Sequence, residues 1–232
     1  MRRDAIWALA ALGLTTGVAS QWGCAGREQH AAEQAAEDVA EALEPAVPVA
    51  RPIGKSPAWG EANKDDGTAE SGYGFVPSAT EGIYVQEFAK SDFAHPYVNE
   101  VCLCLLKTRG EPTASFDIVF YEATDANPAD QPYATVQAMA TGLAQSKEVA
   151  GEFHCVDTGR TAIPEDRFFI GARWNPKQNG FLFICNDQTP AAHPAPVFFR
   201  EDRATGWTSV FNARDPIFGA HQAILVRARS TE

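Results

Sequence analysis

From Tyr73 onward, short apolar runs alternate with polar turns at the spacing of β-strands. In one run Phe116, Ile118 and Phe120 share a face, and Arg167–Trp174 alternates in the same way. Turn signals such as Asn179-Gly180 separate the runs. This pattern has the period of two that predicts strands. The predicted strands span residues 83–89, 98–107, 115–122, 135–143, 152–157, 167–174, 181–185, 196–200, 207–211 and 223–228.

About ten short strands with regular turns favour a two-sheet β-sandwich or a barrel. No stretch after residue 73 has the pattern of a long amphipathic helix. A segment of about 160 residues is long enough to bury one substantial core. We therefore predict an all-β fold, a jelly-roll-like antiparallel β-sandwich over residues 73–232. The order of the strands cannot be read from the alternation.

The first residues have the pattern of an export signal. Arg2 and Arg3 precede an uncharged run, Ala5–Ala19, which is shorter than the roughly 20 apolar residues that span a bilayer. Two cleavage positions are open within residues 1–23. Cleavage after Ser20 follows a small-residue exit, and cleavage before Cys24 follows the pattern of a bacterial lipoprotein, in which that cysteine carries the lipid.

Residues 24–72 are expected to be a flexible or helical tether between the signal and the sandwich. Arg27–Glu44 is rich in Ala and Glu, which favours a solvated helix. Four prolines between residues 45 and 57 then interrupt regular structure and stiffen the chain. No strand or helix period is evident in the polar part that follows. The segment reads as a spacer, with a coiled coil as the alternative.

The chain has five cysteines, an odd number, which leaves one thiol unexplained in an exported protein. Lipidation of Cys24 would leave four, all in the sandwich. Cys102 and Cys104 lie two apart on one predicted strand, about 6.6 Å from each other and on the same face, so they are poorly placed to bond each other. Cys155 and Cys185 are the available partners. We favour disulfides over buried free thiols and over a zinc site, whose usual cysteine spacing is missing.

Five runs carry a resemblance to known modules: Val101–Cys104, Phe116–Tyr121, Phe168–Trp174, Phe183–Gln188 and Ala223–Ala228. They look like the strands of jelly-roll modules in bacterial secreted proteins and lipoproteins, which often follow a signal and a low-complexity tether. The resemblance covers roughly residues 80–228. It implies the fold and a role in binding or display, in the bacterial cell envelope as an outer-membrane-anchored lipoprotein or as a secreted protein. It carries no catalytic residue.

The sequence offers little catalytic chemistry. It has no Gly-x-Ser-x-Gly elbow, no His-Glu-x-x-His helix and no phosphate-binding glycine loop. The histidines lack ligand spacing, so we predict that the protein is not an enzyme. A hydrolase is the minor alternative, because paired carboxylates hydrolyse glycosides. Residues considered for such chemistry are His95, His154, His193, His221, Asp117, Glu122, Asp187 and Glu201.

One loop gathers four residues whose side chains bear oxygen: Glu122, Asp125, Asn127 and Asp130. Oxygen ligands in loops suit Ca²⁺, although the spacing differs from that of an EF-hand. We keep a calcium site as a speculative prediction, beside the reading of a solvated loop. No other cofactor is expected.

Three aromatic residues near turns are the speculative ligand-binding residues: Trp207, Tyr97 and Tyr133. Exposed aromatic rings stack on the apolar faces of sugars, so these residues make a glycan site on the sandwich plausible. Packing within the core or at its edge is the alternative for each of them.

Charge removes another class of partner. Nineteen Lys and Arg stand against 30 Asp and Glu, a formal net charge of −11, and no basic stripe is present. Nucleic acid and anionic lipid both need such a stripe, so neither is an expected partner. The expected protein is exported, anchored to the membrane by lipid, and displays a sandwich that binds a glycan or another ligand. The alternative is a structural or protein-interaction domain that contacts another envelope protein.

Overall fold

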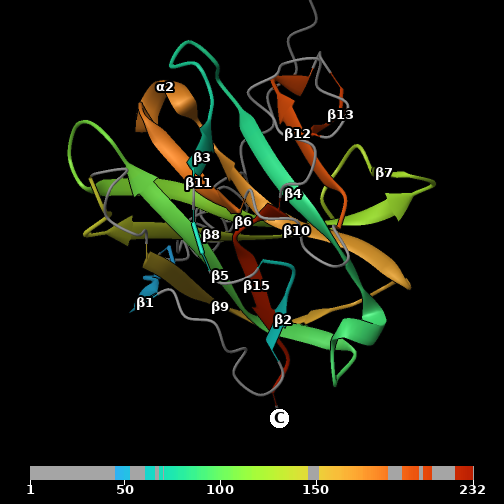
Figure 1. Cartoon of the computed structure of the whole chain (residues 1–232). Coiled ribbons are helices and arrows are strands. Elements are labelled where there is room, and N and C mark those ends of the chain that lie inside the picture. The colour runs from blue at the N-terminus through green and yellow to red at the C-terminus, as the bar shows by residue number, and fades with distance from the viewer. Residues whose placement is uncertain are drawn as a thin grey trace, which may run out of the picture. The chain divides into compact units, whose positions relative to one another are not determined.

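The computed structural model describes residues 45–52, 61–65, 68–69, 71–145, 152–187, 195–203, 206–210 and 223–231. They all belong to one compact unit, Pro45–Glu232. Two antiparallel sheets make up this unit (Figure 1). Among the described residues, no helix is long and apolar enough to cross a membrane.

The sandwich is built from eight strands, β3–β6 and β8–β11. In chain order the first of them pairs with the last, the second with the second last, and so on inward. The four antiparallel pairs are β3 with β11, β4 with β10, β5 with β9, and β6 with β8. One sheet has the order β9-β5-β11-β3 and the other β8-β6-β10-β4. This nested pairing is that of a jelly roll, and it confirms the predicted fold class. The strands are β3 (Ser71–Gly74), β4 (Gly82–Ala89), β5 (Tyr97–Lys107), β6 (Thr113–Thr124), β8 (Ala134–Thr141), β9 (Glu152–Ala162), β10 (Arg167–Trp174) and β11 (Leu182–Asp187).

Shorter elements extend the two sheets. The strands β12 and β13 continue the second sheet beyond β4, and β7 pairs with the end of β6. In the first sheet β14 pairs with β11, and β15 pairs with β5 and β2. The described part of the chain also contains two short helices, η1 and α2. The bounds of these elements are β2 (Glu61–Asn63), η1 (Lys90–Asp92), β7 (Asn127–Pro128), α2 (Pro176–Asn179), β12 (Val197–Glu201), β13 (Thr208–Ser209), β14 (Ala223–Ile224) and β15 (Val226–Arg229).

The structure differs from the expected tether in its last part. Strand β1 (Val49–Pro52) pairs with β9, and Ala46 forms a parallel bridge with Ala138 of β8. The segment thus joins the edges of both sheets, and β2 and β3 follow it in the chain. These additions have only three or four residues each, too few to show a period, and Pro52 is tolerated at the end of an edge strand. Residues 24–44 lie outside the described residues, so a tether there stays a prediction.

The main core fills the space between the sheets. Phe116, Ile118 and Phe120 of β6 lie in it, as the alternation predicts, whereas Asp117 faces outward. On β10 Phe168 and Trp174 point into the same core. These side chains bury apolar surface at about 25 cal/mol per Å², which makes the core the main source of stability.

Both outer faces of the sandwich are also apolar near their centres. On the second sheet Val85, Val119, Tyr121 and Phe169 are fully buried on the face away from the core. Gly171 lies among them, where β10 and β4 approach so closely that a Cβ would stand 1.8 Å from the Tyr84 carbonyl oxygen. Because both faces of these strands are covered, apolar residues occur at consecutive positions as well as alternate ones.

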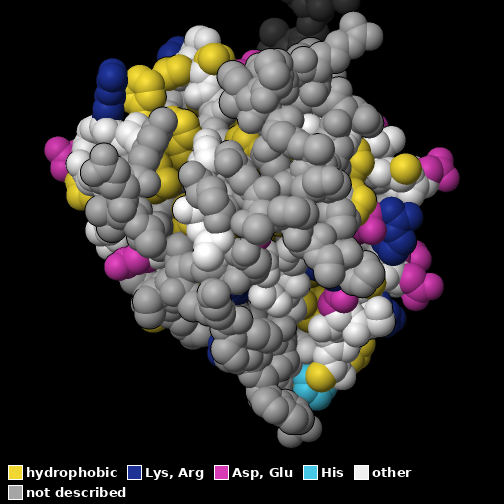
Figure 2. Space-filling model, in the orientation of Figure 1, with side chains coloured by type: hydrophobic (Ala, Val, Ile, Leu, Met, Phe, Trp, Pro, Cys, Tyr) yellow, Lys and Arg dark blue, Asp and Glu magenta, His cyan; other side chains and the backbone are white. Residues whose placement is uncertain are grey.

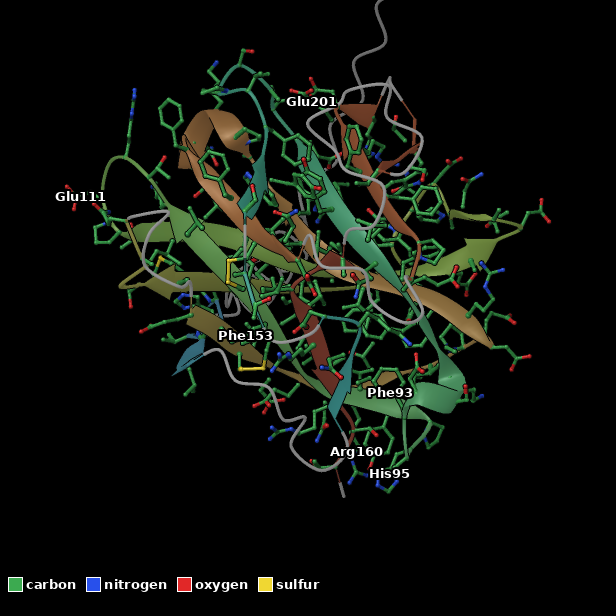
Figure 3. All side chains as sticks on the ribbon, viewed as in Figure 1. Phe93, His95, Glu111, Phe153, Arg160 and Glu201 are labelled. Atoms are coloured by element: carbon green, nitrogen blue, oxygen red, sulfur yellow. A yellow bond between two sulfur atoms is a disulfide. The ribbon has the colours of Figure 1, made fainter. Side chains whose placement is uncertain are left out.

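Two disulfides lie on the outer face of the first sheet, and they use the partners that the sequence left available to Cys102 and Cys104. Cys102 bonds to Cys155 of β9, and Cys104 bonds to Cys185 of β11, with Cα separations of 3.9 and 5.3 Å. Both are drawn in yellow in Figure 3, with Phe153 nearby. The bonds therefore join β5 to strands on either side of it within one sheet, and they do not link the two sheets.

The disulfides generate a test of stability. Replacing Cys104 and Cys185 together by alanine is expected to lower the free energy of unfolding by about 2–5 kcal/mol, because the unfolded chain regains the freedom of a long loop. Denaturant unfolding of the oxidised proteins measures the change. Cys24→Ser is the matched control and should leave the midpoint unchanged; an unaffected midpoint in the double variant would contradict the structural role.

His154 of β9 generates a second test. Its side chain is 1% exposed, its Nε2 has no hydrogen-bond partner among the described residues, and burial lowers its pKa. The unfolded chain therefore binds a proton more readily, and stability is lost as pH falls below about 6.5. His154→Leu should remove this contribution, at most about 1.4 kcal/mol per pH unit. Equal pH slopes of unfolding free energy in both proteins between pH 8 and 5 would contradict it.

Candidate functional site

A hollow of about 370 Å³ lies where the β6–β7 hairpin meets the residue before β13. We call it the Trp207 hollow. Its lining consists of Thr124, Asp125, Asn127, Pro128, Ala129, Asp130 and Trp207. The structure thus brings one of the three aromatic residues singled out in the sequence together with three of the four residues of the predicted calcium loop.

The hairpin turns sharply and presents polar groups to solvent. Thr124 pairs with Asn127, which leaves the two residues Asp125 and Ala126 in the turn. Asp125 has φ of 55°, in the left-handed region that Asp tolerates better than most residues. The side chains of Asp125, Asn127 and Asp130 are exposed. Neither aspartate carboxylate has a hydrogen bond or ion pair among the described residues, so both are open to a ligand.

Trp207 is held in a fixed orientation. Its Nε1–H donates to the Ala129 carbonyl at 3.1 Å, and the Tyr121 ring meets it edge-on at 5.1 Å. The Arg200 guanidinium lies 4.5 Å from the centre of its ring and donates to the Asp130 carbonyl at 3.1 Å. Arg200 was not predicted from the sequence as part of a site. It is nearly buried, and it connects the ring to the acidic loop.

The structure brings together only part of the predicted calcium site. Glu122 is exposed on β6 and does not line the hollow. Within the described parts of the chain, three metal-ligand atoms of His, Cys, Asp or Glu gather within 4.8 Å at Glu100, Cys102 and Cys155. The two sulfur atoms of that group form a disulfide. A calcium site in the loop therefore stays a prediction.

The other two aromatic residues lie elsewhere. The Tyr97 ring stacks on His95 at 5.4 Å, the Arg160 guanidinium lies 5.0 Å from it, and its hydroxyl donates to the Thr231 carbonyl. Figure 3 shows His95 and Arg160 together near the C-terminus. Tyr133 packs against Phe120 at the edge of the core, and burial raises the pKa of its hydroxyl. Neither tyrosine lines the Trp207 hollow.

Two of the side chains considered for catalysis are already bound to partners in the described structure. Cys155 is in a disulfide, so its sulfur is not a free nucleophile beside His154. The Asp117 carboxylate is paired with Arg173. His193, His221 and Cys24 lie outside the described residues. The prediction that the protein is not an enzyme stays a prediction.

Charges of both signs are interspersed on the described surface. Figure 2 shows acidic and basic side chains next to each other along one side of the visible face. Several form ion pairs, among them Arg229 with Glu100 and Lys64 with Asp92. Such mixed charge favours neither a polyanion nor a polycation as the ligand.

A second hollow of about 370 Å³ lies on the same sheet, at the beginning of β6. Asp117 and Arg173 line it, together with Glu81 and Gln137. Asp117, which the sequence places on the outer face, is one of the carboxylates considered above for glycoside hydrolysis. Its pairing with Arg173 follows from the register of β6 and β10, in which the two residues are opposite each other, and alternation alone does not reveal that register.

Comparison with known proteins gives little more. No known family profile and no curated protein matches the sequence. A structure of the cysteine protease and lectin-like domains of Cwp84, a surface-layer-associated protein of Clostridium difficile, is similar with a TM-score of 0.46 and 8% identity, over 66% of this chain and 32% of that one. A structure of Clostridial cysteine protease Cwp84 after propeptide cleavage gives 0.43 and 9%, over 66% and 37%. The chain thus spans about a third of those chains, and at these values the likeness assigns it no function.

Proposed function

We propose that the chain is an exported envelope protein, anchored by lipid at Cys24, whose sandwich binds carbohydrate in the Trp207 hollow. The observation that carries this proposal is the meeting of an aromatic ring with two unpaired carboxylates and an amide in one hollow. Ligand sites in proteins combine such an apolar wall with a few hydrogen-bonding groups that fix orientation.

The chemistry of a sugar matches these groups. One face of a pyranose ring bears C–H groups that pack on an indole, and its hydroxyls can donate to the carboxylates of Asp125 and Asp130. Because Trp207 is already held by Ala129 and Arg200, its ring loses little freedom when a ligand binds. A bound cation such as Ca²⁺ would bind the same carboxylates and bridge them to sugar hydroxyls.

The cysteines support export. Disulfides persist in oxidising compartments outside the cytoplasm, and two of them join β5 to β9 and β11. With four of five cysteines in disulfides, Cys24 is the remaining one, in the position where a lipoprotein signal would place its lipid. Three acyl chains on that residue would anchor the protein firmly.

A protein-interaction role is the second candidate, and one observation favours it. Val47, Val49 and Met139 are exposed by 72%, 60% and 40%, and the Met139 N–H donates to the carbonyl of neighbouring Ala46. Large apolar side chains gathered at one edge of a sandwich can pack against another envelope protein. This role would need no small ligand in the Trp207 hollow.

Retention on insoluble polysaccharide tests the carbohydrate proposal. We expect the oxidised full chain to bind at least one of a panel of cell-wall and plant polysaccharides, and Trp207→Ala to lose about tenfold or more in affinity, because the stacking wall is removed. Calcium and a chelator are compared in parallel, and a loss of binding with chelator would place the ion in the site.

Phe181→Ala is the matched control, since Phe181 is a partly exposed aromatic residue outside the hollow. Thermal unfolding of each variant shows whether the fold is retained. Retention of Trp207→Ala equal to that of the parent, or no retention of the parent on any polysaccharide, would refute the proposal and favour the protein-interaction role.

Fractionation of cells tests the anchor. The parent chain is expected in the membrane fraction, with a diacylglycerol-bearing Cys24 at its N-terminus in mass spectrometry. Cys24→Ser should move the protein to the soluble fraction, because it removes the thioether that holds the lipid. A mature chain that begins at Gln21 in both proteins would show simple secretion instead.

A further inference from the structure

The second hollow has the features of a prepared binding site. It lies on the outer face of the second sheet, at the beginning of β6 and the end of β10, and its volume is about 370 Å³. We call it the Asp117 hollow. Its floor carries Asp117 and Arg173, and its rim carries Glu81, Gln137 and Gln178. The hollow thus combines hydrogen-bonding groups with apolar groups, among them Phe116 and Trp174.

Hydrogen bonds fix two walls of the Asp117 hollow. Asn179 at the end of α2 accepts from the Ser115 N–H at 3.0 Å and donates to the Ser115 carbonyl at 2.8 Å, which fastens α2 to β6. Across the hollow, Asp202 Oδ1 accepts from the Thr80 hydroxyl and from the N–H groups of Thr80 and Glu81. These bonds lower the pKa of Asp202, so the carboxylate stays charged and the wall stays in place at neutral pH.

The ion pair on the floor leaves one acceptor and one donor unused. Both Nε and Nη2 of Arg173 donate to the same oxygen of Asp117, Oδ2, at 2.9 and 2.7 Å. Asp117 Oδ1 and Arg173 Nη1 have no partner among the described residues. Each side chain is partly exposed, with 22% of its surface accessible, so a ligand can reach both. The floor therefore offers an acceptor beside a donor.

The charges of the hollow are balanced. Asp117 is paired with Arg173, and the Glu81 carboxylate lies 3.8 Å from both Arg200 and Arg203. A charged ligand would have to compete with these pairs, whereas a neutral ligand would not. A neutral group that both donates and accepts at adjacent atoms matches this floor. Two neighbouring hydroxyls of a sugar have that arrangement.

We propose that the Asp117 hollow is a second carbohydrate site, which binds a vicinal diol through Asp117 Oδ1 and Arg173 Nη1. One hydroxyl donates to the carboxylate, and the other accepts from the guanidinium, while the amides of Gln137 and Gln178 contact the rest of the sugar. The ligand class rests on the proposed function, but the residues do not. The two hollows lie on the same sheet, and Asp117 and Thr124 are seven residues, about 23 Å, apart along β6. Arg200 lies between the hollows: its guanidinium is 4.5 Å from the centre of the Trp207 ring and 3.8 Å from the Glu81 carboxylate.

Backbone amide chemical shifts test this site directly in the oxidised full chain. The probes are methyl glycosides of glucose, galactose and mannose, with acetamide and sodium acetate as probes that lack a diol. We expect at least one glycoside to shift the amides of residues 115–117 and 173–178, and neither acetamide nor acetate to do so. Shifts there with acetamide or acetate alone, or with no probe, would overturn the proposal.

Three variants assign the binding to this hollow. Asp117→Asn and Gln178→Ala should each weaken the glycoside, Asp117→Asn by about tenfold or more, because it removes a charged acceptor. Gln178 is exposed, and among the described residues only its backbone N–H forms a hydrogen bond, so its replacement should leave the fold intact. Glu165→Gln, at an exposed position between β9 and β10 and outside both hollows, is the control and should bind as the parent does. Unchanged affinity in both test variants would refute the assignment.

This experiment can refute the two proposed carbohydrate sites independently of each other. Trp207→Ala should abolish shifts around residues 124–130 and leave those at Asp117 unchanged. Shifts only around Asp117 would refute the Trp207 site and support the second one. Shifts only around Trp207 would refute the second site and leave the first. No shift at either hollow would overturn both.

Discussion

The rest of the structure depends on the burial of strand β5 on both of its faces. Leu103 and Leu105 point into the core between the sheets, and Cys102 and Cys104 point to the outer face, where each bonds to a flanking strand. A slip of one residue would send the leucines outward and pull both disulfides apart. The alternation of cysteine and leucine therefore fixes the register of β5, and through its pairs the order β9-β5-β11.

The central strands of the second sheet are also buried on both faces. Its outer face is apolar at the centre, around Val119 and Tyr121, and becomes polar at the ends of β6. Strand ends are where loops add side chains from other parts of the chain, so polar groups meet there on a rigid base. Asp117 near one end and the turn at Asp125 beyond the other mark the two hollows. The apolar centre stabilises the packing of the strands, and the strand ends carry the polar side chains that can bind a ligand.

The alternation of the sequence predicted seven of the eight strands of the sandwich, the inward faces of β6 and β10, and the fold class. It did not predict β1, β2 and β3, because strands of three or four residues are too short to show a period. Alternation also does not show which strands are adjacent. It places Asp117 on an outer face, but it does not show that Asp117 lies beside Arg173, which is 56 residues away in the sequence. Likewise, Trp207 meets the Ala129 carbonyl across 78 residues, a contact that only strand order and register define.

The arrangement of the two hollows has a consequence for affinity. Each is shallow and open and offers only a few contacts, so a single sugar would be bound weakly at either one. Both lie on one rigid sheet, and a polymer long enough to reach from one hollow to the other would bind the second hollow as an intramolecular step. The effective concentration then raises affinity without a new contact, and it does so only for long chains. A lipid anchor adds to this effect, because it holds many copies on one surface. Two weak sites at a fixed spacing would thus let an envelope protein bind a polymer tightly while it binds the free sugars of that polymer only weakly.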